Sequence, residues 1–149
     1  MKKINKNGFT LFELLVSISI IAIMTALASV AFSGAQKKAR DARRVQDIKL
    51  VQTAAEQYYS QNTYTYPSTY TAGSVWTPSG STTAILESFP ADPKNTTPYV
   101  YSCRGTCDTT GYCLCAYVEN TSNGNSTNNC TTFTASSATT NYFCVKNQQ

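Results

Sequence analysis

Residues 6–33 read KNGFTLFELLVSISIIAIMTALASVAFS, and this stretch dominates the architecture of the chain. Between Phe9 and Phe32 lie 24 residues with one charge, that of Glu13. As an α-helix they extend ~36 Å, which exceeds the ~30 Å of a bilayer core. The stretch predicts a membrane-spanning helix behind a short basic segment, and it is too long for an ordinary cleaved signal peptide. Cleavage by conventional signal peptidase stays open as an alternative, because Ala26-Leu27-Ala28 has small residues at the two positions that this enzyme recognises.

A helical pattern continues beyond the apolar stretch. Apolar or small side chains recur at steps of three and four, and Leu50 and Ala54 widen the stripe that they form: Ala42, Val45, Ile48, Val51, Ala55 and Tyr58. No proline occurs before Pro67, and Gly34 alone weakens the helix at the join. We therefore expect one helix over residues 9–59, with residues 9–33 in lipid or in a polymer and the remainder against a globular head.

The composition changes at Ser60, after which Tyr, Thr, Ser and Asn dominate. Residues 99–103, 111–119 and 142–146 have the β-branched and aromatic content of strands. A short helix is expected over residues 83–89. The predicted fold class is α+β, a lollipop in which a long N-terminal helix packs on a small antiparallel β-sheet with a disulfide-rich C-terminal region.

Six cysteines occur, all in the last third of the chain: Cys103, Cys107, Cys113, Cys115, Cys130 and Cys144. An even number in one polar region predicts disulfides and an oxidising compartment, with reduced thiols or a zinc site as the alternative. Residues two apart in a strand share a face, so Cys113 and Cys115 can reach the same neighbour. We expect Cys130–Cys144, and we expect Cys103 and Cys107 to pair with Cys113 and Cys115.

Histidine is absent, which excludes Ser-His-Asp and Cys-His catalysis and removes the commonest metal ligand. The sequence predicts no enzyme, no catalytic residue, no cofactor and no metal. The net charge is +4, but Lys2, Lys3 and Lys6 lie in the first eight residues. The basic run at residues 37–44 is compatible with DNA or an anionic surface. We favour a solvated helix turn beside lipid headgroups, so a nucleic-acid partner is not expected, although it stays open.

The segment KNGFTLFELLVS, residues 6–17, closely resembles the class III signal of type IV pilins and of the pseudopilins of type II secretion. That pattern is a basic leader ending in glycine, an aromatic residue, Thr-Leu, an apolar residue, Glu and a long apolar run. The resemblance implies that a prepilin peptidase cleaves the bond between Gly8 and Phe9 and so removes the leader, residues 1–8. It also implies that the new amine of Phe9 is methylated. Helix 9–59 and head 60–149 would remain.

Glu13 is the exceptional residue of the apolar stretch. A carboxylate in hydrocarbon costs several kcal/mol, so it needs a partner or a proton. We expect it to pair with the Phe9 amine of a neighbouring subunit during assembly. The alternative is a Glu13 that is protonated or close enough to the interface to meet water.

These observations predict a structural subunit of an extracellular filament, a helical homopolymer built through residues 9–33. Before assembly the precursor would cross the cytoplasmic membrane once, with its leader in the cytoplasm and its head outside. Its expected partners are copies of itself, the prepilin peptidase and the inner-membrane pilus or secretion assembly machinery.

Two other functions stay open. One alternative is a pseudopilin of a type II secretion or DNA-uptake system, because FPADPKNTTPYVYS, residues 89–102, resembles a stretch of major pseudopilins. Some of those proteins bind calcium nearby, but Asp92 and Asp108 are too few to supply six to eight oxygens. A monomeric, membrane-anchored binding domain is the other alternative.

Overall fold

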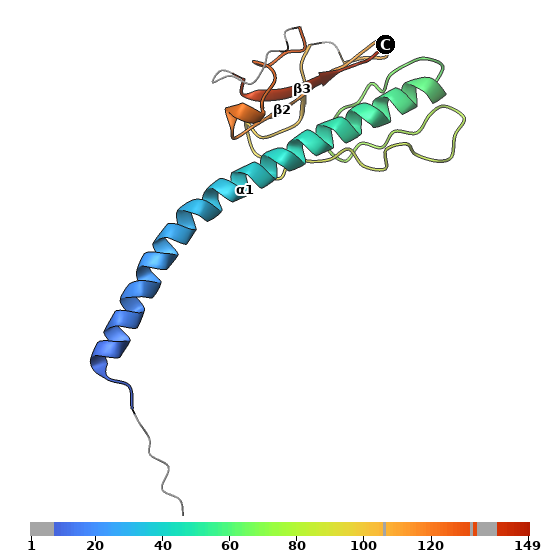
Figure 1. Cartoon of the computed structure of the whole chain (residues 1–149). Coiled ribbons are helices and arrows are strands. Elements are labelled where there is room, and N and C mark those ends of the chain that lie inside the picture. Colours follow the sequence, from blue (N-terminus) through green and yellow to red (C-terminus); the bar gives the residue numbers. More distant parts are fainter. Residues whose placement is uncertain (1–7, 106, 132, 134–139) are drawn as a thin grey trace, which may run out of the picture. The chain divides into compact units, whose positions relative to one another are not determined.

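Helix α1 spans Leu11–Gln61 and confirms the long N-terminal helix (Figure 1). The computed structural model describes residues 8–105, 107–131, 133 and 140–149, so the expected leader lies outside the described residues except for Gly8. The chain divides into two compact units, Met1–Gln36 and Lys37–Gln149. The second unit contains the head together with the C-terminal half of α1.

In the second unit, α1 buries one stripe against the head. Its buried residues follow steps of three and four, with Ala54 beside them: Asp41, Arg44, Ile48, Val51 and Ala55. Leu50, expected in the stripe, is 50% exposed. The reason is geometric, because Leu50 lies two residues after Ile48 and therefore ~200° around the helix. Ala42 is exposed for a similar reason.

A three-stranded antiparallel sheet packs on the buried stripe of α1, and its strands lie in the order β1-β2-β3. Figure 1 shows β2 and β3 beside the C-terminal half of α1. The strands are β1 (Ser102–Cys103), β2 (Cys113–Tyr117) and β3 (Tyr142–Lys146). Each lies within a predicted segment. Leu114 and Ala116 alternate with the cysteines of β2 and belong to the main core together with Val145. The outer face of the sheet carries the cysteines of β2 and β3.

All six cysteines form disulfides, but the expected pairings were wrong. The bonds are Cys103–Cys107, Cys113–Cys130 and Cys115–Cys144. Cys103 lies opposite Leu114, so its side chain is on the face away from Cys113 and Cys115. Cys144 lies directly opposite Cys115 in the β2–β3 ladder, which leaves Cys130 for Cys113.

Aromatic side chains fill the rest of the core. Trp76 is 3% exposed and packs edge-to-face on Tyr70, with ring centroids 5.1 Å apart. The prediction of a helix over residues 83–89 was wrong. Leu86 instead pairs with Trp76 in an isolated β-bridge, with a Trp76 N–H to Leu86 carbonyl bond of 2.9 Å. This extended pairing buries Leu86 and Phe89 beside the aromatic rings.

A buried ion cluster joins the first turn of the stripe to distant loops. The fully buried guanidinium of Arg44 donates to Asp92 through Nε (2.7 Å) and Nη2 (3.1 Å). Its Nη1 donates to Asp41 (2.8 Å) and Glu119 (3.0 Å). The expectation of a solvated turn was therefore wrong for Asp41 and Arg44, because the stripe of α1 continues to these two positions.

Glu119 and Asp41 complete the cluster. Arg40 donates to both oxygens of Glu119, at 2.7 and 2.8 Å, and Lys94 Nζ lies 3.1 Å away. Asp41 accepts the backbone N–H groups of Glu119 and Asn120, both at 2.9 Å. Three cations thus face three carboxylates, which satisfies the need of buried charges for partners.

The cluster shifts the pKa of Glu119 and of Arg44 toward their charged forms. Hydrogen bonds from Arg40, and also from Arg44 and Lys94, hold the pKa of Glu119 well below its ordinary value, although burial alone would raise it. Burial alone would lower the pKa of Arg44, but hydrogen bonds to Asp92, Glu119 and Asp41 raise it above the ordinary value. Both Glu119 and Arg44 therefore remain charged at neutral pH.

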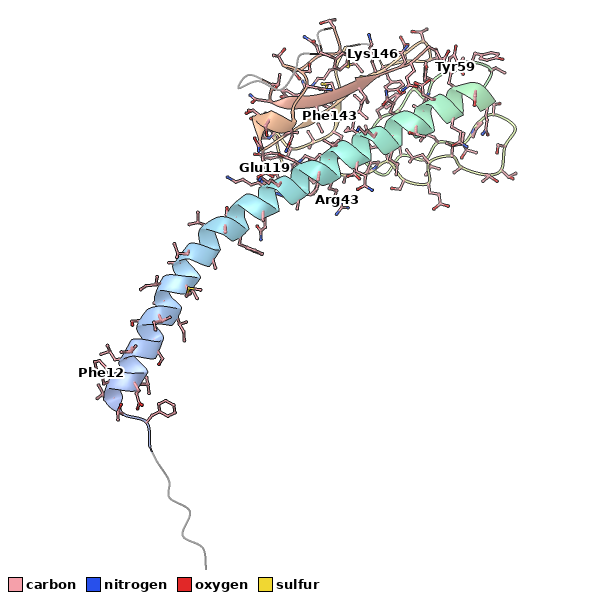
Figure 2. The ribbon with its side chains drawn as sticks, in the orientation of Figure 1. Phe12, Arg43, Tyr59, Glu119, Phe143 and Lys146 are labelled. Carbon is pink, nitrogen blue, oxygen red and sulfur yellow. A yellow bond between two sulfur atoms is a disulfide. The ribbon has the colours of Figure 1, made fainter. Side chains whose placement is uncertain are left out.

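Replacement of Arg44 tests the energetic role of the cluster. Arg44→Met should lower the free energy of unfolding by about 3–5 kcal/mol, because carboxylates remain buried without their cation. The fluorescence of Trp76, the one tryptophan, reports unfolding of the head in denaturant titrations. The matched control is Arg43→Met, since the Arg43 side chain is 67% exposed and points away from the head (Figure 2). Equal stability of the two variants would contradict the role of Arg44.

The lowered pKa of Glu119 predicts acid sensitivity of the head. An unfolded chain protonates this carboxyl near its ordinary value of 4.5, whereas the folded head resists protonation. The stabilisation is therefore complete above that pH and declines as the pH falls below it. Glu119→Gln should lower stability at neutral pH and flatten the acid decline. Glu87→Gln, at an exposed position, should leave the pH profile unchanged; an unchanged profile in Glu119→Gln would refute this prediction.

Candidate functional site

The predicted processing site lies just before α1. Gly8, Phe9 and Thr10 precede the helix and are exposed. A Cβ atom placed on Gly8 meets no atom within 4 Å, and Gly8 does not adopt a left-handed conformation. Among the described residues, nothing in the subunit itself requires glycine at this position. A requirement for glycine here would have to come from another protein that approaches the backbone.

Thr10 and Glu13 form a reciprocal cap at the start of α1. One oxygen of Glu13, Oε2, accepts the Thr10 backbone N–H (2.9 Å) and the Thr10 hydroxyl (2.7 Å). The Thr10 hydroxyl in turn accepts the Glu13 backbone N–H at 3.2 Å. No hydrogen bond or ion pair from the described residues reaches the other oxygen, Oε1. The spacing Thr-x-x-Glu is a capping-box signal that the sequence already contained and that sequence analysis did not use.

The helix that follows is apolar and exposed on all sides. Phe12, labelled in Figure 2, is 73% exposed, and Leu27 is 67% exposed. Four hydroxyl groups of this segment donate to carbonyls of the preceding turn: those of Ser17, Ser19, Thr25 and Ser29. Their polarity is therefore satisfied within the helix, as a hydrocarbon environment requires. By length and composition α1 can cross a membrane.

The basic run after the apolar segment separates into two groups. Lys37, Lys38 and Arg43 are exposed, as expected for a solvated turn. Arg40 and Arg44 are engaged with Glu119 and, for Arg44, with further acids of the ion cluster. The run therefore offers fewer available cations to a polyanion than its sequence indicates.

The clustered cysteines and the two aspartates considered as calcium ligands already have partners in the described part of the head. Within it, Cys113, Cys115 and Cys130 form the one group of three or more such residues within reach of a common ion, and all three are in disulfides. Both oxygens of Asp92 accept hydrogen bonds from Arg44. The carboxylate of Asp108 accepts from Thr110 in its own turn.

Comparison with known proteins agrees with the geometry at the N-terminus. Residues 3–29 match the family model described as the prokaryotic N-terminal methylation motif. No curated protein and no solved structure gives a significant match to the chain. The matched range contains Gly8, Phe9, the Thr10–Glu13 cap and most of the apolar segment. The chain thus carries, at residues 3–29, the class III signal peptide of type IV pilins and pseudopilins.

Proposed function

We propose that the mature chain begins at Phe9 and is a structural subunit of a type IV pilus-like extracellular filament. One observation carries this proposal: an apolar, fully exposed helix segment contains a single carboxylate, Glu13, with one oxygen still available. Such a segment needs lipid or other copies of itself around it. A lone carboxylate close to a new N-terminus supplies a specific contact between copies.

The cap at the start of α1 prepares Glu13 for this contact. Thr10 holds Oε2 and so restricts the side chain before assembly. Oε1 can then accept the charged Phe9 amine of a neighbouring subunit while the cap persists. In a low-dielectric filament core this pair would be strong, and it would fix the axial stagger of the helices.

Membrane insertion and export follow from the same segment. The precursor would be anchored by residues 9–33, with its leader in the cytoplasm and its disulfide-bonded head outside. Prepilin peptidase would cut between Gly8 and Phe9, the Phe9 amine would be methylated, and the inner-membrane machinery would add subunits to the filament. The role is structural rather than catalytic.

A pseudopilin of a secretion or DNA-uptake system is the second candidate. The stretch Pro90–Pro93, with Asp92 fixed by Arg44, supports it through its resemblance to major pseudopilins. A monomeric anchored binding domain is less well supported, because it gives Glu13 no partner. Long surface filaments in electron micrographs favour the pilus, whereas loss of protein secretion in a deletion strain favours the pseudopilus.

Processing at Gly8 is the first expectation of this function. Intact mass measurement of the protein from cells should give a chain that begins at Phe9 and carries one added methyl group. Gly8→Val should block cleavage without disturbing the fold, because the position is open. Gly34→Ala is the matched control at another open position, and it should be processed normally. A wild-type chain that begins at Met1 or after Ala28 would overturn the proposal.

Replacement of Glu13 separates assembly from insertion. Glu13→Gln removes the charge, and Glu13→Leu also removes the cost of burying a polar group, so both precursors should insert in the membrane. Both should yield few filaments, because loss of one partner from a buried charge pair costs about 3–5 kcal/mol at every subunit. The measurement is sheared filament relative to membrane-bound subunit.

The control for this experiment is Ser17→Ala, which removes a hydroxyl that donates to the Leu14 carbonyl in its own helix turn. Its filament yield should equal that of the wild type. Normal yields from both Glu13 variants would show that Glu13 does not direct assembly and would favour the anchored monomer.

A further inference from the structure

An open cleft of about 610 Å³ lies at one end of the β-sheet, away from the N-terminal segment in sequence. Two cationic side chains, Arg104 and Lys146, line it together with the amide side chains of Asn128 and Asn147. Figure 2 shows Lys146 at the end of strand β3. The filament function proposed above makes no use of this cleft.

Strand register places the two cations on the same face of the sheet. The backbone N–H of Arg104 donates to the carbonyl of Cys113 at 2.8 Å, which continues the pairing of β1 with β2. Cys113 in turn lies opposite Lys146 in the β2–β3 ladder. Residues opposite one another share a face, so Arg104 and Lys146 flank Cys113 on the outer face, with backbones ~10 Å apart. Both side chains are long enough to contact one ligand between them.

No acidic side chain neutralises these two cations in the described part of the chain. The lining of the cleft contains no Asp or Glu, and no ion pair of the described residues involves Arg104 or Lys146. The residues of the head outside the described ranges, 106, 132 and 134–139, are Thr, Ala and Ser in sequence and add no acid. The cleft therefore has a net positive charge.

The acids of the chain are committed elsewhere. Three of the eight belong to the ion cluster around Arg44. Asp47, Glu56 and Asp108 accept hydrogen bonds from hydroxyl groups of the head. Glu13 caps α1, and Glu87 lines a separate groove. None of these eight acids therefore lies in the cleft to balance the charges of Arg104 and Lys146.

Arg104 has a buried donor that lacks an acceptor. Its Nε is buried and has no hydrogen-bond partner among the described residues. Its Cζ lies 5.3 Å from the centroid of the Tyr142 ring, so the aromatic ring supports the guanidinium group. A buried donor without a partner is uncommon in folded proteins, and an acceptor supplied by a ligand would satisfy it. An oxyanion is the acceptor that matches a guanidinium edge best.

Disulfides fix both walls of the cleft. Cys103–Cys107 closes the short loop that carries Arg104, and Cys113–Cys130 ties the opposite wall, residues 128–131, to strand β2. Walls fixed in this way lose little conformational entropy when a ligand binds. The positive charge of the cleft is therefore held in place before a ligand arrives.

We propose that this cleft binds the oxyanion of a hydrophilic ligand, a carboxylate or a phosphate group, between Arg104 and Lys146. The guanidinium of Arg104 donates to two oxygens of the anion, and the ammonium of Lys146 supplies the second charge. The Asn128 side chain in the lining can hydrogen-bond a polar group that flanks the anion. The proposal does not depend on filament formation.

The test is NMR titration of the ¹⁵N-labelled full-length chain in neutral detergent micelles. The probes are inorganic phosphate, glucuronate and, as the uncharged comparison, glucose, all at constant ionic strength. Phosphate or glucuronate should shift the amide signals of Arg104, Cys113 and Lys146 saturably, and glucose should not. A response to one anion alone identifies the ligand class as phosphate or carboxylate.

Variants decide whether the response comes from this cleft. Arg104→Gln should weaken anion binding about tenfold or more, because a charge-assisted hydrogen-bonding group is lost. Arg104→Lys retains the charge and should bind with intermediate affinity. Lys146→Gln offers an independent test at an exposed position if the Arg104 variants fold poorly. Arg43→Gln, which removes an equal charge from an exposed site outside the cleft, should bind as the wild type.

Three results would overturn the proposal. One is the absence of a saturable shift with either anion. Another is equal affinity in the wild type and in well-folded Arg104→Gln and Lys146→Gln variants. The third is an equal response to glucose, which would show that charge does not determine binding.

Discussion

The apolar side chains of residues 11–32 cannot stay in water, and this constraint governs the rest of the structure. They surround the helix on every side, and each costs about 1.5–3 kcal/mol when left exposed. No stripe of this segment is polar enough to face solvent while another faces the head. A lipid bilayer, and then other copies of the segment, are the environments that suit it. In both, Glu13 is the one ionisable group, and it must find a partner.

The C-terminal half of the same helix, in contrast, buries one stripe of side chains against the head. From Asp41 to Ala55 the buried stripe repeats at three and four residues, but its composition changes along the way. Its C-terminal part, Ile48–Ala55, is apolar and packs on the sheet. Its first turn contains the buried ion pair of Asp41 and Arg44. Bonds from Arg44 and Asp41 to residues 92, 119 and 120 tie the head's loops to the helix at this point.

Much of the fold could be predicted from sequence, because periodicity and composition are local signals. They predicted α1, the strands and the shared face of Cys113 and Cys115. The predicted disulfide pairing was wrong, because pairing depends on the register between segments far apart in sequence. Cys103 lies on the face of the sheet opposite to that of Cys113 and Cys115. The burial of Arg44 was not predicted, because the search for core positions considered apolar and small residues alone. Arg44 nevertheless occupies a position that continues the buried stripe of α1. At the candidate site, the motif at Gly8–Glu13 was recognised, but the cap formed by Thr10 was not.

In the proposed filament, the Glu13 carboxylate of one copy accepts a hydrogen bond from the Phe9 amine of another. A reconstruction of sheared wild-type filaments by electron cryo-microscopy tests it most directly. We expect a core of helices from residues 9–33, with the Phe9 nitrogen of each subunit ~3 Å from a carboxylate oxygen of Glu13 in a neighbour. A filament held together by heads alone, or one in which the Phe9 amine lies far from every Glu13, would contradict it.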